Sequence, residues 1–128
     1  MKTHQTTVRV RYEDADPMGF LHHSKYLSYF EIGRTEMYRA AGGNYRQLEE
    51  SGQFVVVVRA EIRYRRPARY DDVVMVRTTL KKITAAKIIH EYEMVLEEQS
   101  LATATVTLAL VDRKGQAQRI PEWMRELI

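Results

Sequence analysis

Four stretches of the chain have the character of β-strands, at residues 54–64, 73–83, 86–97 and 101–111. Apolar and polar residues alternate in the first, after an initial valine run, and in the third, whereas the last is rich in β-branched residues. In the first stretch, one side collects Val56, Val58, Ala60, Ile62 and Tyr64, and the other side collects Arg59, Glu61, Arg63 and Arg65. Alternation with a period of two is typical of β-strands that bury one face. Because short polar turns separate the stretches, we expect neighbouring strands to pair antiparallel.

Residues 24–41 follow a helical pattern instead. Their apolar and small residues recur at intervals of three and four positions, at Tyr26, Tyr29, Phe30, Gly33, Met37 and Ala40. Gly42 and Gly43 favour a helix end, since glycine readily adopts the left-handed conformation found there. Gly33 inside the helix costs about 1 kcal/mol of helix propensity relative to alanine. We therefore expect this glycine to allow close approach of a neighbouring surface.

The remaining chain adds a first strand at residues 6–12, with Val8, Val10 and Tyr12 on one side. It also adds a short helical turn at residues 45–50 and a final helix at residues 122–127, which Pro121 opens. The order is therefore one strand, one long helix and four strands. This order and the length of 128 residues predict a single α+β domain over residues 1–128, with a mostly antiparallel sheet around the helix.

The composition limits the class of protein and the cellular location that we expect for this domain. Hydrophobic residues make up 45% and charged residues 29%, as in ordinary globular proteins. No apolar run approaches the roughly 18 residues that span a bilayer, and the polar N-terminus lacks the apolar segment of a signal peptide. Cysteine is absent, which excludes disulfides and thiolate metal sites. We predict a cytoplasmic protein without membrane insertion.

Basic residues cluster in one part of the chain, although the net charge is only +3. The cluster consists of Arg59, Arg63, Arg65, Arg66 and Arg69, followed by Lys81, Lys82 and Lys87. Such local charge attracts phosphate groups or acidic partners, although a solvated strand face would carry the same residues. No nucleic-acid-binding motif accompanies the charge, so we predict no nucleic-acid partner.

Acidic residues and turn-forming residues directly precede the predicted long helix. Glu13, Asp14 and Asp16 are followed by a proline, Gly19 and two adjacent histidines, His22 and His23. Acids at this place often cap a helix or interact with its dipole. A carboxylate near free helix N–H groups also suits a nucleophile or general base beside an oxyanion site. Adjacent histidines at a helix start do not converge on one ion, so we predict no metal site.

Three segments resemble one known family. The run from Asp16 to Tyr26, DPMGFLHHSKY, resembles the signature of hotdog-fold acyl-CoA thioesterases of the 4-hydroxybenzoyl-CoA thioesterase-like family. The segments FEIGRTEM at residues 30–37 and RRPARYDDVV at residues 65–74 resemble the family's helix and its second recurring block. The resemblance implies a curved antiparallel sheet wrapped around one long central helix. It also implies a homodimer or tetramer, with sheets joined edge to edge and active sites between subunits.

The same resemblance implies an activity, hydrolysis of an acyl-CoA thioester to a free acid and coenzyme A, with no separate cofactor. Its catalytic residues fall on Asp16 as nucleophile or general base, on His23 through the backbone N–H that polarises the carbonyl, and on Gly19 in the tight turn. We assign the acyl pocket and the coenzyme A phosphates to His22, Tyr26, Arg59, Arg63, Arg65, Lys81 and Lys82. Nearby subfamilies often carry tyrosine where this chain has His22, which leaves the acyl preference open.

Two alternative functions remain at this stage. The basic residues would also suit an acidic acyl carrier protein, which would make the chain an acyl-ACP thioesterase. A non-catalytic acyl-CoA-binding protein on the same scaffold is the other alternative, although the carboxylate at Asp16 argues against it. The sequence also leaves open dimer against tetramer and nucleophilic against general-base catalysis.

Overall fold

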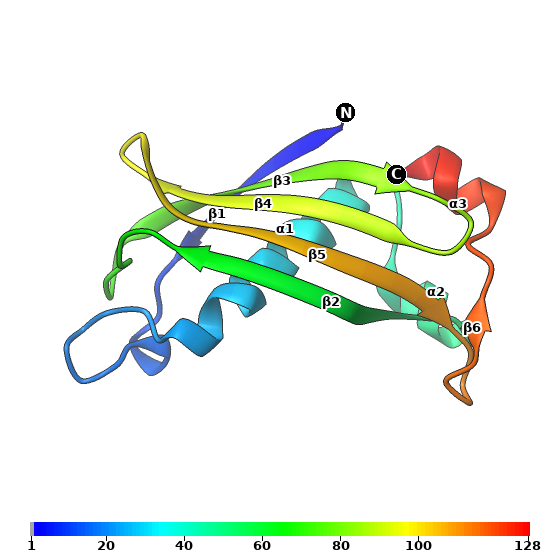
Figure 1. The fold of residues 1–128 in the computed structure, drawn as a ribbon, viewed down its shortest axis with the longest axis horizontal. Coiled ribbons are helices and arrows are strands. Elements are labelled where there is room, and N and C mark those ends of the chain that lie inside the picture. The colour runs from blue at the N-terminus through cyan, green and yellow to red at the C-terminus, as the bar shows by residue number, and fades with distance from the viewer. Residues whose placement is uncertain (1) are drawn as a thin grey trace.

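One antiparallel sheet curves around one long helix, which confirms the predicted α+β architecture (Figure 1). The computed structural model describes residues 2–128. Its strands are β1 (Thr3–Arg9), β2 (Phe54–Tyr64), β3 (Val73–Ile83), β4 (Ile88–Leu96), β5 (Gln99–Val111) and β6 (Ala117–Gln118). Its α-helices are α1 (Tyr26–Ala40), α2 (Tyr45–Glu50) and α3 (Glu122–Leu127). Within residues 2–128, no helix combines the length and the hydrophobicity that crossing a bilayer requires.

The strand order places β1 and β2 at the two edges of the sheet. The strands run β1-β3-β4-β5-β2, every pairing is antiparallel, and the short β6 pairs with β5. The inner face of the sheet contacts α1 through alternate residues of the central strands, such as Val74, Val76, Tyr92, Met94 and Leu108. This alternation is the period of two on which the sequence prediction was based.

Helix α1 approaches the sheet most closely at Gly33. A Cβ at this position would lie 2.5 Å from Thr78 Oγ1 and 2.7 Å from Val76 Cγ1, closer than side chains can pack. The predicted close approach is therefore present, and it explains why glycine is placed within the helix despite its low propensity. Further along the helix, Arg34 is buried on the inner face, which an apolar pattern cannot reveal.

Two details of the sequence prediction were wrong. The first strand covers Thr3–Arg9 rather than residues 6–12, and Tyr12 is 77% exposed instead of facing inward with Val10. The chain turns here because Asp14 N–H donates to the Arg11 carbonyl and closes a 3₁₀ turn at Tyr12–Asp14. In β2, a bulge between Val57 and Arg59 breaks the alternation, so Val57, not Val56, lies opposite the buried Leu108.

A buried polar cluster fills the inner face near the C-terminal end of α1. The side chain of Arg34 pairs with Glu31 at 3.1 Å and lies near His90 and Tyr92 of β4. Burial, reinforced by the positive charge of Arg34, lowers the pKa of His90 to about 4. Burial also raises the pKa of Tyr92 to about 12. His90 is therefore a neutral interior histidine, as is usual for one on an apolar strand face.

The pKa of His90 predicts a pH-dependent stability. An unfolded histidine has a pKa near 6.5, so between pH 6.5 and pH 4 the unfolded chain binds a proton that folded His90 does not. The free energy of unfolding therefore falls as pH decreases through this window, by about 3 kcal/mol from this group. Urea denaturation across the window measures the slope. His90→Gln is expected to flatten it, whereas His4→Gln on the edge strand serves as the control; equal slopes in both variants would contradict the assignment.

Candidate active site

Asp14 anchors the acidic loop to α1. Its carboxylate is buried and accepts a hydrogen bond from the Tyr29 hydroxyl, with 2.8 Å between Oδ2 and the phenolic oxygen. The same hydroxyl accepts the Arg11 N–H at 3.2 Å, and Lys25 Nζ lies 3.9 Å from Asp14 Oδ1. Burial raises the pKa of Tyr29 to about 12, so the phenol keeps its proton as a donor. Asp14 is thus a structural residue that joins the loop to the helix.

Asp16 lies in a tight turn that its own carboxylate closes. Oδ1 accepts the Met18 N–H at 2.9 Å and the Phe20 N–H at 3.0 Å, while the Asp16 N–H donates to the Phe20 carbonyl at 2.7 Å. Gly19 has φ = +82°, the left-handed conformation that glycine adopts most easily, which agrees with its predicted place in the turn. No hydrogen bond within residues 2–128 reaches Oδ2, so one oxygen of a firmly held carboxylate is free.

A 3₁₀ turn at His23–Lys25 follows and leads directly into α1. The His22 N–H donates to the Asp14 carbonyl at 2.8 Å, which places the two arms of the loop side by side. The His22 ring caps this 3₁₀ turn, because its Nδ1 accepts the Ser24 N–H at 3.2 Å, and the His22 carbonyl accepts the Lys25 N–H at 2.9 Å. Among the described residues, the N–H of His23 has no hydrogen-bond partner, although the N–H groups around it are all engaged.

Two tyrosines lie beside Asp16 and the helix start. Tyr64, the last residue of β2, donates its hydroxyl to the His23 carbonyl at 3.0 Å, and its ring contacts Tyr26 edge-on with centroids 5.0 Å apart. Tyr26 is buried and accepts the Ala68 N–H at 3.2 Å. Burial raises the pKa of Tyr26, and the nearby Tyr64 and negative Asp16 raise it further. These contacts bring the edge strand, the loop and α1 together, as Figure 1 shows at the pointed end of β2.

The segment between β2 and β3 holds the other side of the loop. The Leu21 N–H donates to the Ala68 carbonyl, and the Tyr70 N–H donates to the Gly19 carbonyl, both at 2.8 Å. The Arg69 guanidinium lies over the Phe20 ring, 4.9 Å from its centroid. The turn that carries Asp16 is therefore fixed by hydrogen bonds on both of its sides. Such a fixed carboxylate suits a role that needs a defined direction.

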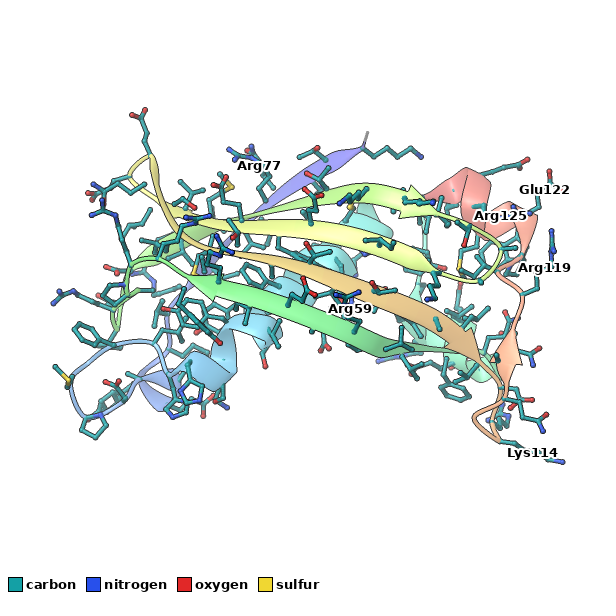
Figure 2. The ribbon with its side chains drawn as sticks, in the orientation of Figure 1. Arg59, Arg77, Lys114, Arg119, Glu122 and Arg125 are labelled. Atoms are coloured by element: carbon teal, nitrogen blue, oxygen red, sulfur yellow. The ribbon has the colours of Figure 1, made fainter. Side chains whose placement is uncertain are left out.

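The predicted phosphate-binding residues fall into two groups. Arg63 and Arg65 flank Tyr64 at the end of β2 nearest the loop, whereas Arg59 pairs with Glu61 and lies midway along the sheet (Figure 2). Lys81 and Lys82 lie near the far end of β3, about 26 Å along the strand from Val73 at about 3.3 Å per residue. Lys81 also forms an ion pair with Glu91 at 3.1 Å.

Sequence reasoning missed some of the residues that build this site. It treated Tyr64 only as a strand residue, and it did not link Asp14 to Tyr29. Arg66 and Arg69 were noticed as part of the basic cluster but were not assigned to the site. Proximity of Tyr64 to the helix start depends on the curvature of the sheet, which alternation alone does not specify. Within residues 2–128, no three histidine or acidic side chains gather closely enough to hold a metal ion.

Comparisons with known proteins agree with this architecture. The family model of the thioesterase-like superfamily matches residues 10–128. Acyl-CoA thioesterase YbgC of Haemophilus influenzae is 38% identical over 106 residues, which cover 82% of this chain and 78% of that protein. The chain therefore belongs to the thioesterase-like superfamily, and the family resemblance seen in the sequence is confirmed.

Solved structures share the fold over almost the whole chain. A DHNA-CoA thioesterase from Staphylococcus aureus superimposes with a TM-score of 0.93 at 24% identity, covering 99% of this chain and 89% of that one. A thioesterase from Thermus thermophilus, complexed with coenzyme A and zinc, superimposes with a TM-score of 0.83 at 28% identity. That match covers 97% of this chain and 90% of the Thermus chain. The predicted hotdog fold is thereby confirmed.

Proposed function

We propose that this member of the thioesterase-like superfamily hydrolyses acyl-CoA thioesters to a free carboxylic acid and coenzyme A. One observation carries the proposal: a free carboxylate oxygen on Asp16 and a free backbone N–H on His23 come from the two arms of one rigid loop. A thioester carbonyl needs attack at its carbon and a hydrogen-bond donor for the oxygen that becomes negative. The two unengaged atoms supply these two functions. The activity of the Haemophilus relative supports the same reaction.

Asp16 can serve the reaction by either of two routes. As a nucleophile, Oδ2 adds to the carbonyl carbon, the coenzyme A thiolate leaves, and water hydrolyses the mixed anhydride, which restores the carboxylate. As a general base, Asp16 takes a proton from water, the resulting hydroxide adds to the carbon, and the departing thiolate recovers the proton. In both routes the His23 N–H, at the positive end of the α1 dipole, stabilises the tetrahedral oxyanion.

Arginines next to the site are suited to the phosphates of coenzyme A. Tyr64 and Ala68 both contact the site, and the segment between and after them carries Arg65, Arg66 and Arg69, all exposed. None of these three guanidinium groups forms an ion pair within residues 2–128, so their charges are available for phosphate oxygens. We favour them over Lys81 and Lys82 because the lysines lie at the opposite end of β3. The coenzyme A complex of the Thermus relative supports this ligand class.

We further propose that two copies of the chain join through β2. This edge strand is eleven residues long and exposes Val57 at 51% and Val58 at 53%. Within residues 2–128 it pairs with β5 alone. A long edge with exposed apolar residues and open backbone groups tends to pair with another strand. Antiparallel pairing of two such edges would extend the sheet and bring a second chain close to Tyr64 and the loop, so that both chains would contribute to the site.

Replacing Asp16 tests the reaction. Asp16→Asn keeps an oxygen that can accept the Met18 and Phe20 N–H groups, so the loop should remain folded while the charge is lost. We expect kcat for acyl-CoA hydrolysis to fall about 100- to 10,000-fold. Release of free thiol from a panel of acyl-CoA substrates measures the effect. The matched control is Glu13→Gln, an exposed acid of the same loop, whose kcat should stay near that of the wild type. Equal turnover by Asp16→Asn and wild type would refute the proposed function.

Truncated substrates test the arginine assignment. Arg66→Gln and Arg69→Gln together are expected to raise KM for acyl-CoA about 3- to 10-fold, because exposed charge-assisted contacts to phosphate are lost. KM for the corresponding acyl-pantetheine, which has no nucleotide, should not change. Lys81→Gln combined with Lys82→Gln removes the same charge at the far end of the sheet and should leave both KM values unaltered. An equal increase in KM for both substrates would contradict nucleotide binding by these arginines. Comparing the hydrolysis rates of one acyl group attached to coenzyme A and to acyl carrier protein distinguishes an acyl-CoA thioesterase from an acyl-ACP thioesterase.

A charge on the edge strand tests the dimer. Val58→Lys places an ammonium group against the partner edge and is expected to shift the protein toward the single chain in light-scattering measurements. Val73→Lys introduces the same group at a similarly exposed valine of β3 and should leave the assembly unchanged. A wild-type protein that is monomeric at micromolar concentration would sink this part of the proposal.

A further inference from the structure

The peptide groups on both sides of His23 are held by separate hydrogen bonds. The carbonyl of His22, in the peptide that contains the free N–H, accepts the Lys25 N–H at 2.9 Å. The carbonyl of His23, in the next peptide, accepts the Tyr64 hydroxyl at 3.0 Å. The first bond belongs to the helix start itself, but the second comes from the end of a distant strand. The backbone of residue 23 is thereby fixed on both sides.

The hydroxyl of Tyr64 is itself held in a defined place. Its ring packs edge-on against Tyr26 with an interplanar angle of 85°, and Tyr26 is buried and bonded to the Ala68 N–H. The backbone of Tyr64 lies opposite Ala102 in the ladder with β5. Yet Tyr64 remains 47% exposed, so burial of the ring does not explain why a tyrosine occupies this position. A phenylalanine would make the same ring contact; what the hydroxyl adds, within residues 2–128, is its hydrogen bond to the His23 carbonyl.

We propose that Tyr64 is a positioning residue that aims the His23 N–H at the carbonyl oxygen of the thioester. The inference rests on the proposed function, and it adds to it a residue from the edge strand. Tyr64 acts through the backbone of His23 and does not itself donate to the substrate. Because an oxyanion donor must point to the place where charge develops, a small rotation of the peptide reduces its effect in the transition state more than in the bound substrate.

This role predicts a specific kinetic signature. Tyr64→Phe removes the hydroxyl and keeps the ring, so the contact with Tyr26 persists. We expect kcat to fall about 10-fold with KM unchanged, a partial form of the loss seen when an oxyanion donor is removed outright. The amide resonance of His23 in a ¹H–¹⁵N spectrum should shift, because the peptide next to it loses its hydrogen bond. Tyr12→Phe, which removes an exposed hydroxyl next to the acidic loop, is the control and should alter neither quantity.

The outcomes separate the inference from the proposed function. Unchanged kcat in Tyr64→Phe, with Asp16→Asn inactive, would overturn the positioning role and leave the hydrolase intact. A rise in KM alone would also overturn it, since Tyr64 would then only contribute to substrate binding. If the wild type released no thiol from any acyl-CoA, the proposed function would fail, whereas a shifted His23 amide in Tyr64→Phe would still support the positioning contact. An unshifted amide would overturn that contact as well.

Discussion

The site depends on the hydrogen bond between the Tyr29 hydroxyl and the Asp14 carboxylate. Tyr29 belongs to the buried face of α1, and Asp14 belongs to the loop that carries Asp16. A buried carboxylate needs partners, so this bond also fixes where the loop can lie. Since the same hydroxyl accepts the Arg11 N–H, one phenol holds the chain both before Asp14 and at it. Together with the hydrogen bonds of the loop to Ala68 and Tyr70, this attachment holds Asp16 and His23 in place.

The two ends of α1 have different surroundings. At its start the acidic loop packs beside it, and within residues 2–128 the His23 N–H and the loop's Asp16 Oδ2 have no hydrogen-bond partner. Toward its C-terminal end, Arg34 and His90 are buried on the inner face, and the lowered pKa of His90 keeps that histidine neutral there. Gly33 lies between these regions and sets the closest approach of helix and sheet. Close packing in the middle of the helix therefore supports a rigid helix start, which an oxyanion donor requires.

The sequence predicted the elements well because their periodicities are local. The limits of β2 and β3 follow from alternation and from turn residues such as Asp71 and Asp72, and α1 follows from its apolar repeat. The predictions that were wrong concern features that depend on contacts between residues far apart in the sequence. The shift of β1 results from the turn that Asp14 makes toward Tyr29, and the bulge in β2 depends on pairing with β5. The position of Asp16 was found by resemblance, whereas the contact of Tyr64 with His23 requires the fold itself.

The loop leaves one hydrogen-bond donor and one acceptor without a partner among the described residues, and these two groups indicate the reaction. Backbone N–H groups at Met18, Phe20, Leu21, His22, Ser24 and Lys25 all donate within the chain, and one oxygen of Asp16 accepts twice. Within residues 2–128, the remaining donor, the His23 N–H, and the remaining acceptor, Asp16 Oδ2, have no hydrogen-bond partner. The two that stay free have opposite character, one electron-rich and one a proton donor. A carbonyl presents the complementary pair, an electrophilic carbon and a hydrogen-bond-accepting oxygen, so a thioester can engage both without disturbing the bonds that hold the loop.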